Sequence, residues 1–208
     1  MNPAKEPEGM DDASVILASQ SEVRARMLRA AGVRFHIEPV KVDEEELRRG
    51  FVNEGARGHE IAEALAEIKA IRASGRTERL VIAADQILSL DKQIFGKPTS
   101  LEEARSQLLK LRGQTHELAS AVCVAKSGAV IWRKLDTAEL RMRRFSDDFL
   151  DWYLLRHGDR VMTSVGGYQI EGEGLQLFES IKGDYFTILG LPLTDLLAFL
   201  RVHGMLLS

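Results

Sequence analysis

Residues 81–88, VIAADQIL, form an apolar stretch interrupted only by Asp85 and Gln86. A short apolar run rich in β-branched residues predicts a buried strand. An isolated charge in such an interior costs several kcal/mol or shifts its pKa, so a buried acid is usually paired, bound to a cation or placed at the mouth of a cleft. The stretch therefore predicts a strand that carries a functional carboxylate.

The chain has 208 residues, 45% of them hydrophobic, which is enough for one large domain or two lobes around a cleft. A net charge of −3 argues against a surface that coats polymeric nucleic acid. Cys123 is the single cysteine, so no disulfide can form within the chain, and its apolar neighbours indicate a core position in a reducing compartment.

Residues 1–12 are polar and acidic with Pro and Gly, and we expect them to form a disordered tail before a single two-lobed domain over 13–208. No apolar run approaches the ~18 to 20 residues that a membrane span requires. We therefore expect a cytoplasmic protein without a membrane partner.

Helices and strands alternate along the chain. Strands are predicted at 15–18, 33–37, 81–88, 94–95, 117–125, 129–134 and 137–143, and helices at 24–31, 59–73, 101–111, 146–157 and 192–200. The acidic run 43–46 leads toward a loop near 50–58, and 175–181 with 185–189 resembles a hairpin. The interleaving predicts a mixed α/β (α+β) fold, a mixed twisted sheet with helices on its faces.

A serine turn between the first strand and the first helix places Ser19, Ser21 and Arg24 at a helix N-terminus. Backbone N–H groups and the helix dipole attract phosphate at such a position. An ordinary capped helix explains the same pattern, and this segment alone favours that simpler interpretation.

Two lysines are further candidates. Lys69 lies at the border of the buried face of the 59–73 helix, where a lysine can simply extend its ammonium to solvent. Lys97 lies between Gly96 and Pro98, which fix the backbone of a stiff loop and present one cation. In isolation each signal is weak.

Glu44, in the acidic run, and Asp85 are the candidate metal ligands. Mg²⁺ prefers carboxylate oxygens and keeps several waters, so one or two acids with substrate phosphates form a typical site. The alternative for Glu44 is a solvated surface acid, and for Asp85 a salt-bridged or capping acid. Cations and acids together favour phosphate-ester or anhydride chemistry, and no Walker loop, GxGxxG or Cys/His cluster supports other classes.

The order of several segments resembles the Maf family of nucleoside triphosphate pyrophosphatases over nearly the whole chain after the tail. These segments are LASQSEVRARML (17–28), VDEEE (42–46), ALAEIKA (64–70), IAADQIL (82–88), FGKP (95–98), LRGQTHEL (111–118), GGYQIEG (166–172) and GDYFTILGLPL (183–193). Any one of them is a weak signal, but their shared order is a strong one.

The resemblance implies a role for each matched residue. The triphosphate is bound by Ser19, Ser21, Arg24, Lys69 and Lys97. Glu44 and Asp85 hold Mg²⁺, or another divalent cation such as Mn²⁺, and act in catalysis with Lys69. The resemblance also implies a Maf/ITPase-like fold, in which two lobes flank a central cleft, and often a homodimer.

Departures from the family's pattern mark a divergent branch. Glu22 and Val23 stand where the family has Pro and its first Arg, and Arg26 is expected to replace part of the missing charge. Gln86 stands in place of Thr and is expected to contact the substrate. Together with the altered motif around Tyr168, it leaves the base open among UTP, dTTP and methylated guanosine triphosphate.

The expected reaction is hydrolysis at the α-phosphorus, which releases a nucleoside monophosphate and pyrophosphate as nucleotide-pool housekeeping. One alternative is a nucleotide-binding regulator of cell division that does not hydrolyse its ligand. Another is a phosphotransferase or monophosphatase, for which orthophosphate would be the diagnostic product.

Overall fold

A mixed seven-stranded sheet forms the centre of the computed structural model, which describes residues 15–207. Its strands are β1 (Val15–Leu17), β2 (His36–Ile37), β3 (Leu80–Leu90), β4 (Gln93–Phe95), β5 (Thr115–Lys126), β6 (Ala129–Met142) and β7 (Phe178–Lys182). The order is β2-β1-β3-β5-β6-β7, and β4 pairs with β3. β2, β1 and β3 are parallel, whereas the remaining pairs are antiparallel. The expected tail at 1–12 lies outside the described residues.

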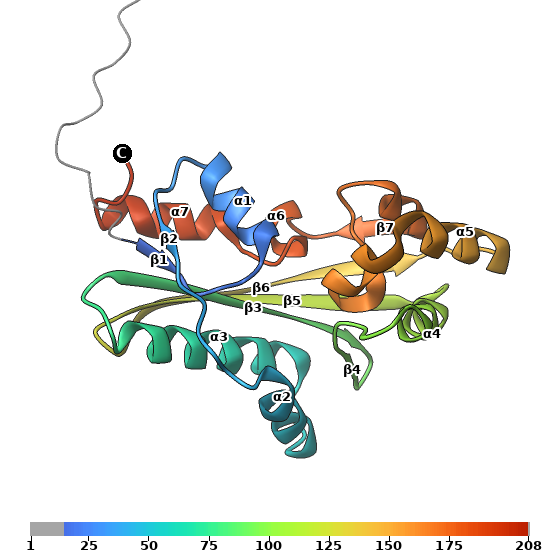
Figure 1. Cartoon of the computed structure of the whole chain (residues 1–208), viewed down its shortest axis with the longest axis horizontal. Helices are drawn as coiled ribbons and strands as arrows, with labels where there is room; N and C mark the ends of the chain where they lie inside the picture. The colour runs from blue at the N-terminus through green and yellow to red at the C-terminus, as the bar shows by residue number, and fades with distance from the viewer. Residues whose placement is uncertain (1–14, 208) are drawn as a thin grey trace, which may run out of the picture.

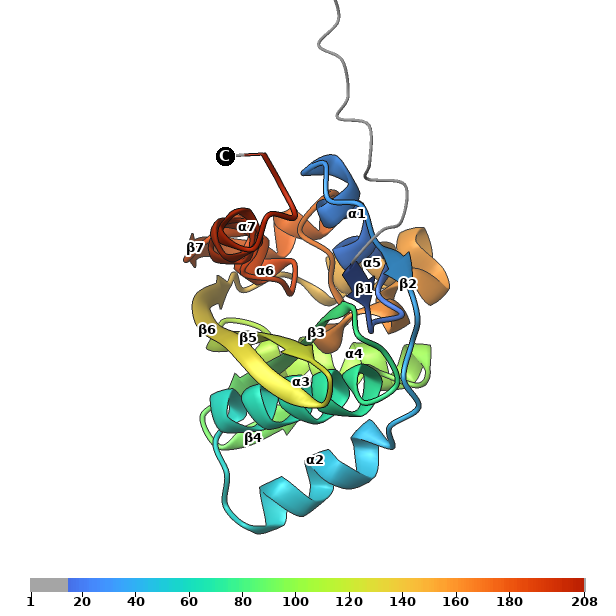
Figure 2. The same ribbon diagram turned by 90° about the vertical axis from the view of Figure 1, so that its left-hand side faces the viewer.

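Helices cover both faces of the sheet (Figures 1 and 2). They are α1 (Glu22–Ala30), α2 (Glu44–Asn53), α3 (Gly58–Ser74), α4 (Leu101–Leu111), α5 (Asp147–His157), α6 (Tyr185–Ile188) and α7 (Leu193–Val202), with short 3₁₀ helices η1 (Gly158–Thr163), η2 (Val165–Gly167) and η3 (Glu173–Leu177). α3 lies on one face with α2 outside it, and α1 and α7 lie on the other. The predicted mixed α/β fold is confirmed.

β3 is buried on both faces, and its alternating side chains enter different cores. Val81, Ala83 and Ile87 pack in the cluster with α3. Ile82 and Ala84 pack in the cluster with α1 and α7. Because successive side chains of a strand point to opposite faces, Asp85 shares the face of α3 and Gln86 points to the other face.

The two ends of β3 belong to different core regions. α1, α3 and α7 pack around its first half, whereas Leu88 joins a cluster built by α4, α5 and the 3₁₀ segments. On one edge β3 pairs with β1 through 80–82 and with β4 through 88–90. Between these partners, 83–87 have no strand partner on that edge among the described residues.

Several predicted elements differ from the structure. β6 is one strand of 14 residues instead of two, because it pairs with β5 continuously through Leu135 and Asp136. The predicted hairpin is wrong, since β7 ends at Lys182 and Asp184 caps the short helix α6 by accepting from the Thr187 N–H. The segment 44–53 is the helix α2, capped by Asp43, rather than a lead into a loop.

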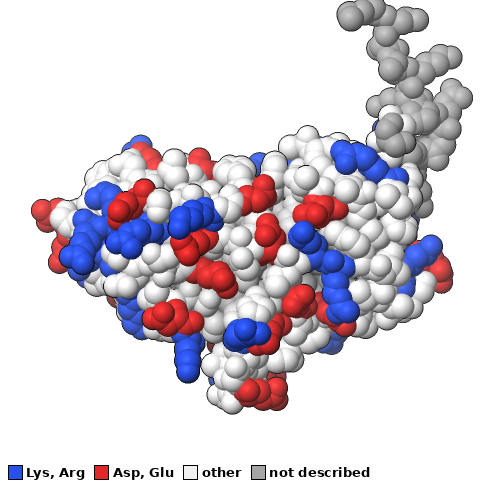
Figure 3. Space-filling model, turned by 180° about the vertical axis from the view of Figure 1, so that it is seen from behind, with Lys and Arg blue, Asp and Glu red and all other residues white. Residues whose placement is uncertain are grey.

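The described helices include none that is both long and apolar enough to cross a membrane. On the face shown in Figure 3, acidic and basic side chains are interspersed. Opposite charges therefore lie close together over this face of the molecule.

Candidate active site

Lys69 joins the two acids that the sequence singled out. Its Nζ lies 2.6 Å from Asp85 Oδ1 and 2.8 Å from Glu44 Oε1. Lys69 and Asp85 are each only 6% exposed, whereas Glu44 reaches solvent. The buried acid of β3 is thus tolerated because an ammonium group pairs with it. Two acids that are distant in the sequence therefore meet at one ammonium group.

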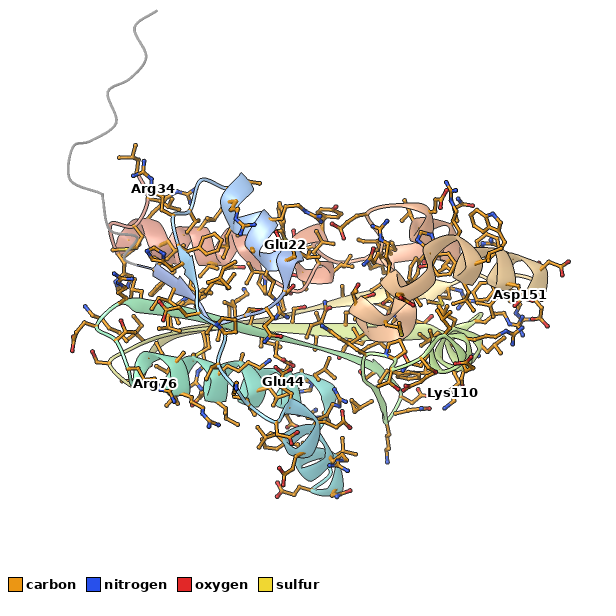
Figure 4. All side chains as sticks on the ribbon, in the orientation of Figure 1. Glu22, Arg34, Glu44, Arg76, Lys110 and Asp151 are labelled. Atoms are coloured by element: carbon orange, nitrogen blue, oxygen red, sulfur yellow. The ribbon has the colours of Figure 1, made fainter. Side chains whose placement is uncertain are left out.

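Three elements bring this cluster together. Lys69 follows Leu65 by one turn on the sheet-facing side of α3, and Asp85 points to the same side from β3. Glu44 begins α2, where Asp43 accepts a hydrogen bond from the Glu46 N–H at 3.0 Å. In Figure 4, Glu44 lies where the start of α2 approaches α3.

The Asp85 carboxyl has a pKa above its usual value. Burial is the main cause, and the nearby charges of Lys69 and Arg24 offset it only in part, while Glu44 raises the pKa further. Desolvation disfavours the ionised form of an acid. A further cation would therefore stabilise the Asp85 carboxylate.

Arg24 reaches the same region from α1 and is fixed by backbone and hydroxyl acceptors. Its Nε donates to Gly190 O at 2.8 Å, and its Nη1 donates to Ala84 O at 2.9 Å and to Ser19 Oγ at 3.2 Å. Burial lowers the pKa of Arg24, and Asp85 and Glu44 oppose that change. Nη2 bonds to no described residue and can bind a ligand.

Ser21 has a local role as well, since its Oγ accepts from the Arg24 N–H at 3.4 Å and caps α1. Ser19 Oγ accepts from the Ser21 N–H at 3.2 Å and from Arg24. The two hydroxyls therefore shape the helix N-terminus that presents Arg24, and capping and phosphate binding are compatible uses of it.

Lys97 lies beside the cluster without pairing to it. Desolvation is the main cause of its lowered pKa, Arg24 and Lys69 add to it, and Glu44 and Asp85 oppose it. These four charges act on the pKa of Lys97, although its side chain remains exposed. Its ammonium has no hydrogen bond or ion pair within residues 15–207, so it is available to an anion.

Gln86 is held on the opposite face of β3. Its Nε2 donates to Ser120 Oγ at 3.0 Å, Thr187 O at 3.2 Å and Ile188 O at 3.0 Å. Backbone carbonyls only accept, so this network fixes the amide orientation and leaves Oε1 as a free acceptor. Ser120 and Thr187 could not be predicted from the sequence, because nothing in the sequence shows which residue the hydroxyl of a single Ser or Thr contacts.

A pocket of about 80 Å³ lies on the Gln86 side. It is lined by Val23, Gln86, Leu118, Thr163, Ser164, Val165, Tyr168, Gln169, Ile170, Glu171, Ile188 and Leu189. Glu44, Lys69 and Asp85 are not part of this lining. The pocket adjoins the charged cluster through the neighbouring residues Asp85 and Gln86, so the two regions can serve two parts of one ligand.

Arg26 does not join the cations of the cluster, contrary to expectation. It forms an exposed ion pair with Glu171, which lines the pocket. Arg26 follows Arg24 by two residues, and positions two apart on a helix point in different directions. The missing charge at Val23 is therefore not replaced by Arg26.

The residues present fit a divalent ion that is shared with a substrate. Within residues 15–207 no group of three or more His, Cys, Asp or Glu side chains could hold a metal. Glu44 and Asp85 nevertheless converge on one ammonium group. Mg²⁺ is commonly bound by one or two carboxylates and completes its shell with water and substrate phosphates.

The fold and this arrangement define an α/β protein with a carboxylate and cation cluster beside a pocket. Residues 14–203 match the family described as Maf-like protein, and the chain belongs to that family. It is 51% identical to a nucleoside triphosphate pyrophosphatase of Caulobacter vibrioides, over 92% of this chain and 96% of the relative. It is 45% identical to a 7-methyl-GTP pyrophosphatase of Brucella abortus, over 90% and 94%.

Proposed function

We propose that this protein, a nucleoside triphosphate pyrophosphatase of the Maf-like family, cleaves the α–β anhydride bond of its substrate at the cluster of Glu44, Lys69 and Asp85. The observation that carries the proposal is the Lys69 ammonium shared by two carboxylates beside Arg24 and Lys97. The products are a nucleoside monophosphate and pyrophosphate.

The triphosphate lies against the cations and the N-terminus of α1. Arg24 and Lys97 neutralise phosphate oxygens, and the Ser19 and Ser21 turn adds hydroxyl and backbone donors. Lys69 stabilises the charge that develops on the phosphates during bond cleavage. Most of the acceleration then comes from positioning and electrostatics, since phosphoryl chemistry asks little covalent work of the protein.

A divalent ion such as Mg²⁺ or Mn²⁺, held by Glu44 and Asp85, would polarise the phosphate and make a bound water more acidic. The ionised Asp85 carboxylate would orient the attacking water and accept its proton. The same carboxylate can therefore serve as a ligand and as a base.

The base lies in the adjacent pocket. Glu171 and the free Oε1 of Gln86 are acceptors, so they favour a base with N–H donors on its edge, as guanine has. A 7-methylated guanine ring carries positive charge, and the Glu171 carboxylate would stabilise it in competition with its exposed ion pair to Arg26. Relatives named 7-methyl-GTP pyrophosphatase agree with this choice.

Product analysis with a panel of triphosphates tests the proposal. The purified protein with Mg²⁺ is incubated with 7-methyl-GTP, GTP, UTP and dTTP, and pyrophosphate and orthophosphate are measured separately. Pyrophosphate with a monophosphate, fastest for 7-methyl-GTP, is the expected result. Orthophosphate would point to a phosphatase or phosphotransferase, and binding without release would point to a regulator.

A substitution separates the base proposal from the phosphate chemistry. Glu171→Gln removes the charge of the pocket and should lower the preference for 7-methyl-GTP over UTP by about tenfold, the loss of one charge-assisted contact. Glu173→Gln, outside the pocket lining, should leave the preference unchanged. An unaltered preference in Glu171→Gln would refute the base assignment.

A further inference from the structure

The loop that carries Lys97 is held on two sides at Gly96. A Cβ atom at Gly96 would lie 2.6 Å from Arg48 Nη2, 3.1 Å from Cζ and 3.4 Å from Nη1. The guanidinium of Arg48 therefore lies close to the side of this glycine where a Cβ atom would stand, with Nη2 nearest. On the other side, Gln107 Nε2 of α4 donates to Gly96 O at 3.2 Å. The position next to Lys97 is thus fixed by contacts from α2 and from α4.

Arg48 lies one helical turn after Glu44 on α2, and residues four apart share a helix face. None of the residues of α2 is buried, yet the Arg48 side chain is only 20% exposed. It also pairs with Glu45. Arg48 is therefore partly covered, as are Leu47 and Phe51 of the same helix, and Gly96 of the loop 96–98 lies beside its guanidinium.

We propose that Arg48 is a positioning residue for Lys97: it ties α2 to the loop 96–98 and so keeps the Lys97 ammonium over the cluster of Glu44, Lys69 and Asp85. The inference rests on the proposed function, in which Lys97 binds phosphate. Lys97 has no partner of its own within residues 15–207, so the direction of its side chain depends on how its backbone is held.

The contact leaves no room for a Cβ atom at position 96 unless the Arg48 side chain shifts. The φ of Gly96 lies outside the left-handed region, so alanine is free of backbone strain there. A methyl group would instead displace the guanidinium. Gly96→Ala and Arg48→Ala therefore break the same contact from opposite sides. A lysine at position 48 keeps the charge but has no planar group to lie against the glycine.

The first test compares matched variants. Arg48→Ala, Arg48→Lys and Gly96→Ala should each raise KM for the triphosphate about tenfold with kcat nearly unchanged, the signature of lost uniform binding. Arg49→Ala and Gly50→Ala are the controls, because Arg49 is exposed and nothing lies within 4 Å of a Cβ at Gly50. Their KM should stay at the wild-type value. Wild-type KM in Arg48→Ala, or full rescue by lysine, would overturn the inference.

The second test asks whether Arg48 acts through Lys97. Effects on one shared contact are not additive. In a Lys97→Ala background, Arg48→Ala should therefore change KM by less than about twofold, and the Arg48→Ala/Gly96→Ala double variant should match either single one. A full further tenfold loss would show that Arg48 acts independently of Lys97 and would reject positioning.

A binding measurement keeps this inference distinct from the proposed function. The dissociation constant of a non-hydrolysable triphosphate is measured by calorimetry in the same variants. If the wild type releases no pyrophosphate, the proposed function fails, but weaker binding in Arg48→Ala, Arg48→Lys and Gly96→Ala alone still supports positioning. Equal binding in these variants and in the controls rejects positioning even when the wild type is active.

Discussion

Asp85 combines burial with a charge that its neighbours only partly offset. Lys69 Nζ lies 2.6 Å from Asp85 Oδ1, yet the pKa of Asp85 stays above the usual value. If Asp85 were a purely structural acid, a neutral residue of similar shape could replace it with little loss of kcat. A catalytic acid could not, and this difference is measurable.

Asp85→Asn should lower kcat about a hundredfold or more with the fold intact, on the scale seen when one catalytic group is removed. The amide has nearly the same shape, and Lys69 keeps Glu44 as a partner. Steady-state kinetics and thermal unfolding measure the two effects. Asp91→Asn is the control, because Asp91 is exposed and has a φ of +52°, which asparagine tolerates. Full turnover in Asp85→Asn would reject the assignment.

His116 makes a residue-scale prediction for stability. It is 2% exposed, its Nε2 lies 2.8 Å from Tyr168 Oη, and burial lowers its pKa to about 4. The unfolded chain binds a proton near the ordinary pKa of about 6.5, so stability is complete above that pH and falls as the pH drops toward the folded-state value.

The free energy of unfolding should fall by roughly 3 kcal/mol near pH 4, because the pKa of His116 differs between the unfolded and folded states. Urea unfolding between pH 4 and 7.5 measures it. His116→Phe removes the titrating group, so its stability should depend less on pH over this range. Parallel curves for the two proteins would show that His116 does not titrate as described.

At the scale of elements, β3 separates the proposed phosphate site from the proposed base pocket. Asp85 faces α3 and Gln86 faces the pocket, because adjacent residues of a strand point to opposite faces. Ser120 of β5 ties this strand to α6, since it accepts from Gln86 and donates to Thr187 O at 2.7 Å. A change on one face should therefore spare the other.

Ser120→Ala should loosen the Gln86 amide and reduce discrimination among bases several-fold, while kcat for the preferred triphosphate stays near wild type. One neutral hydrogen bond contributes about 1 kcal/mol, which is the basis of that size. The ratio of kcat/KM for 7-methyl-GTP and UTP measures the effect. Ser180→Ala, on the exposed strand β7, is the control. A large fall in kcat with unchanged discrimination would contradict the separation.

Elements with a clear period could be predicted from the sequence, as α3, α4 and β3 show. α6 could not, because Tyr185–Ile188 has the aromatic and β-branched composition of a strand and only the Asp184 cap decides for a helix. The helix α2 could not be predicted, because Gly50 disfavours a helix and the many charged residues of the segment leave few apolar positions to show a period. β6 was divided in two because Asp136 looks like a turn residue, although its carboxylate accepts from Thr187 Oγ1.

The candidate site could be predicted from the sequence where a charged residue stands at a position that should be buried. Asp85 in an apolar strand and Lys69 on a buried helix face were such cases. Arg48 and Ser120 were not, since their importance lies in distances across the fold to Gly96 and Gln86. A sequence pattern reports spacing along an element and says nothing of such contacts.

The whole molecule assembles the site from both core regions. Arg24 comes from α1, which packs over the first half of β3, and Lys97 precedes α4, which packs over the second half. Glu44 and Lys69 come from the helices of the opposite face. The substrate and its metal would therefore meet where these parts converge, beside the 83–87 edge of β3.

The most direct test is a crystal structure with Mn²⁺ and a triphosphate whose α–β bridge resists hydrolysis. The expected result is an anomalous peak from a manganese ion that is bound by Glu44, Asp85 and phosphate oxygens, with Arg24 and Lys97 in contact with the phosphates. A manganese ion held elsewhere, with the Glu44 and Asp85 carboxylates still paired only to Lys69, would contradict it.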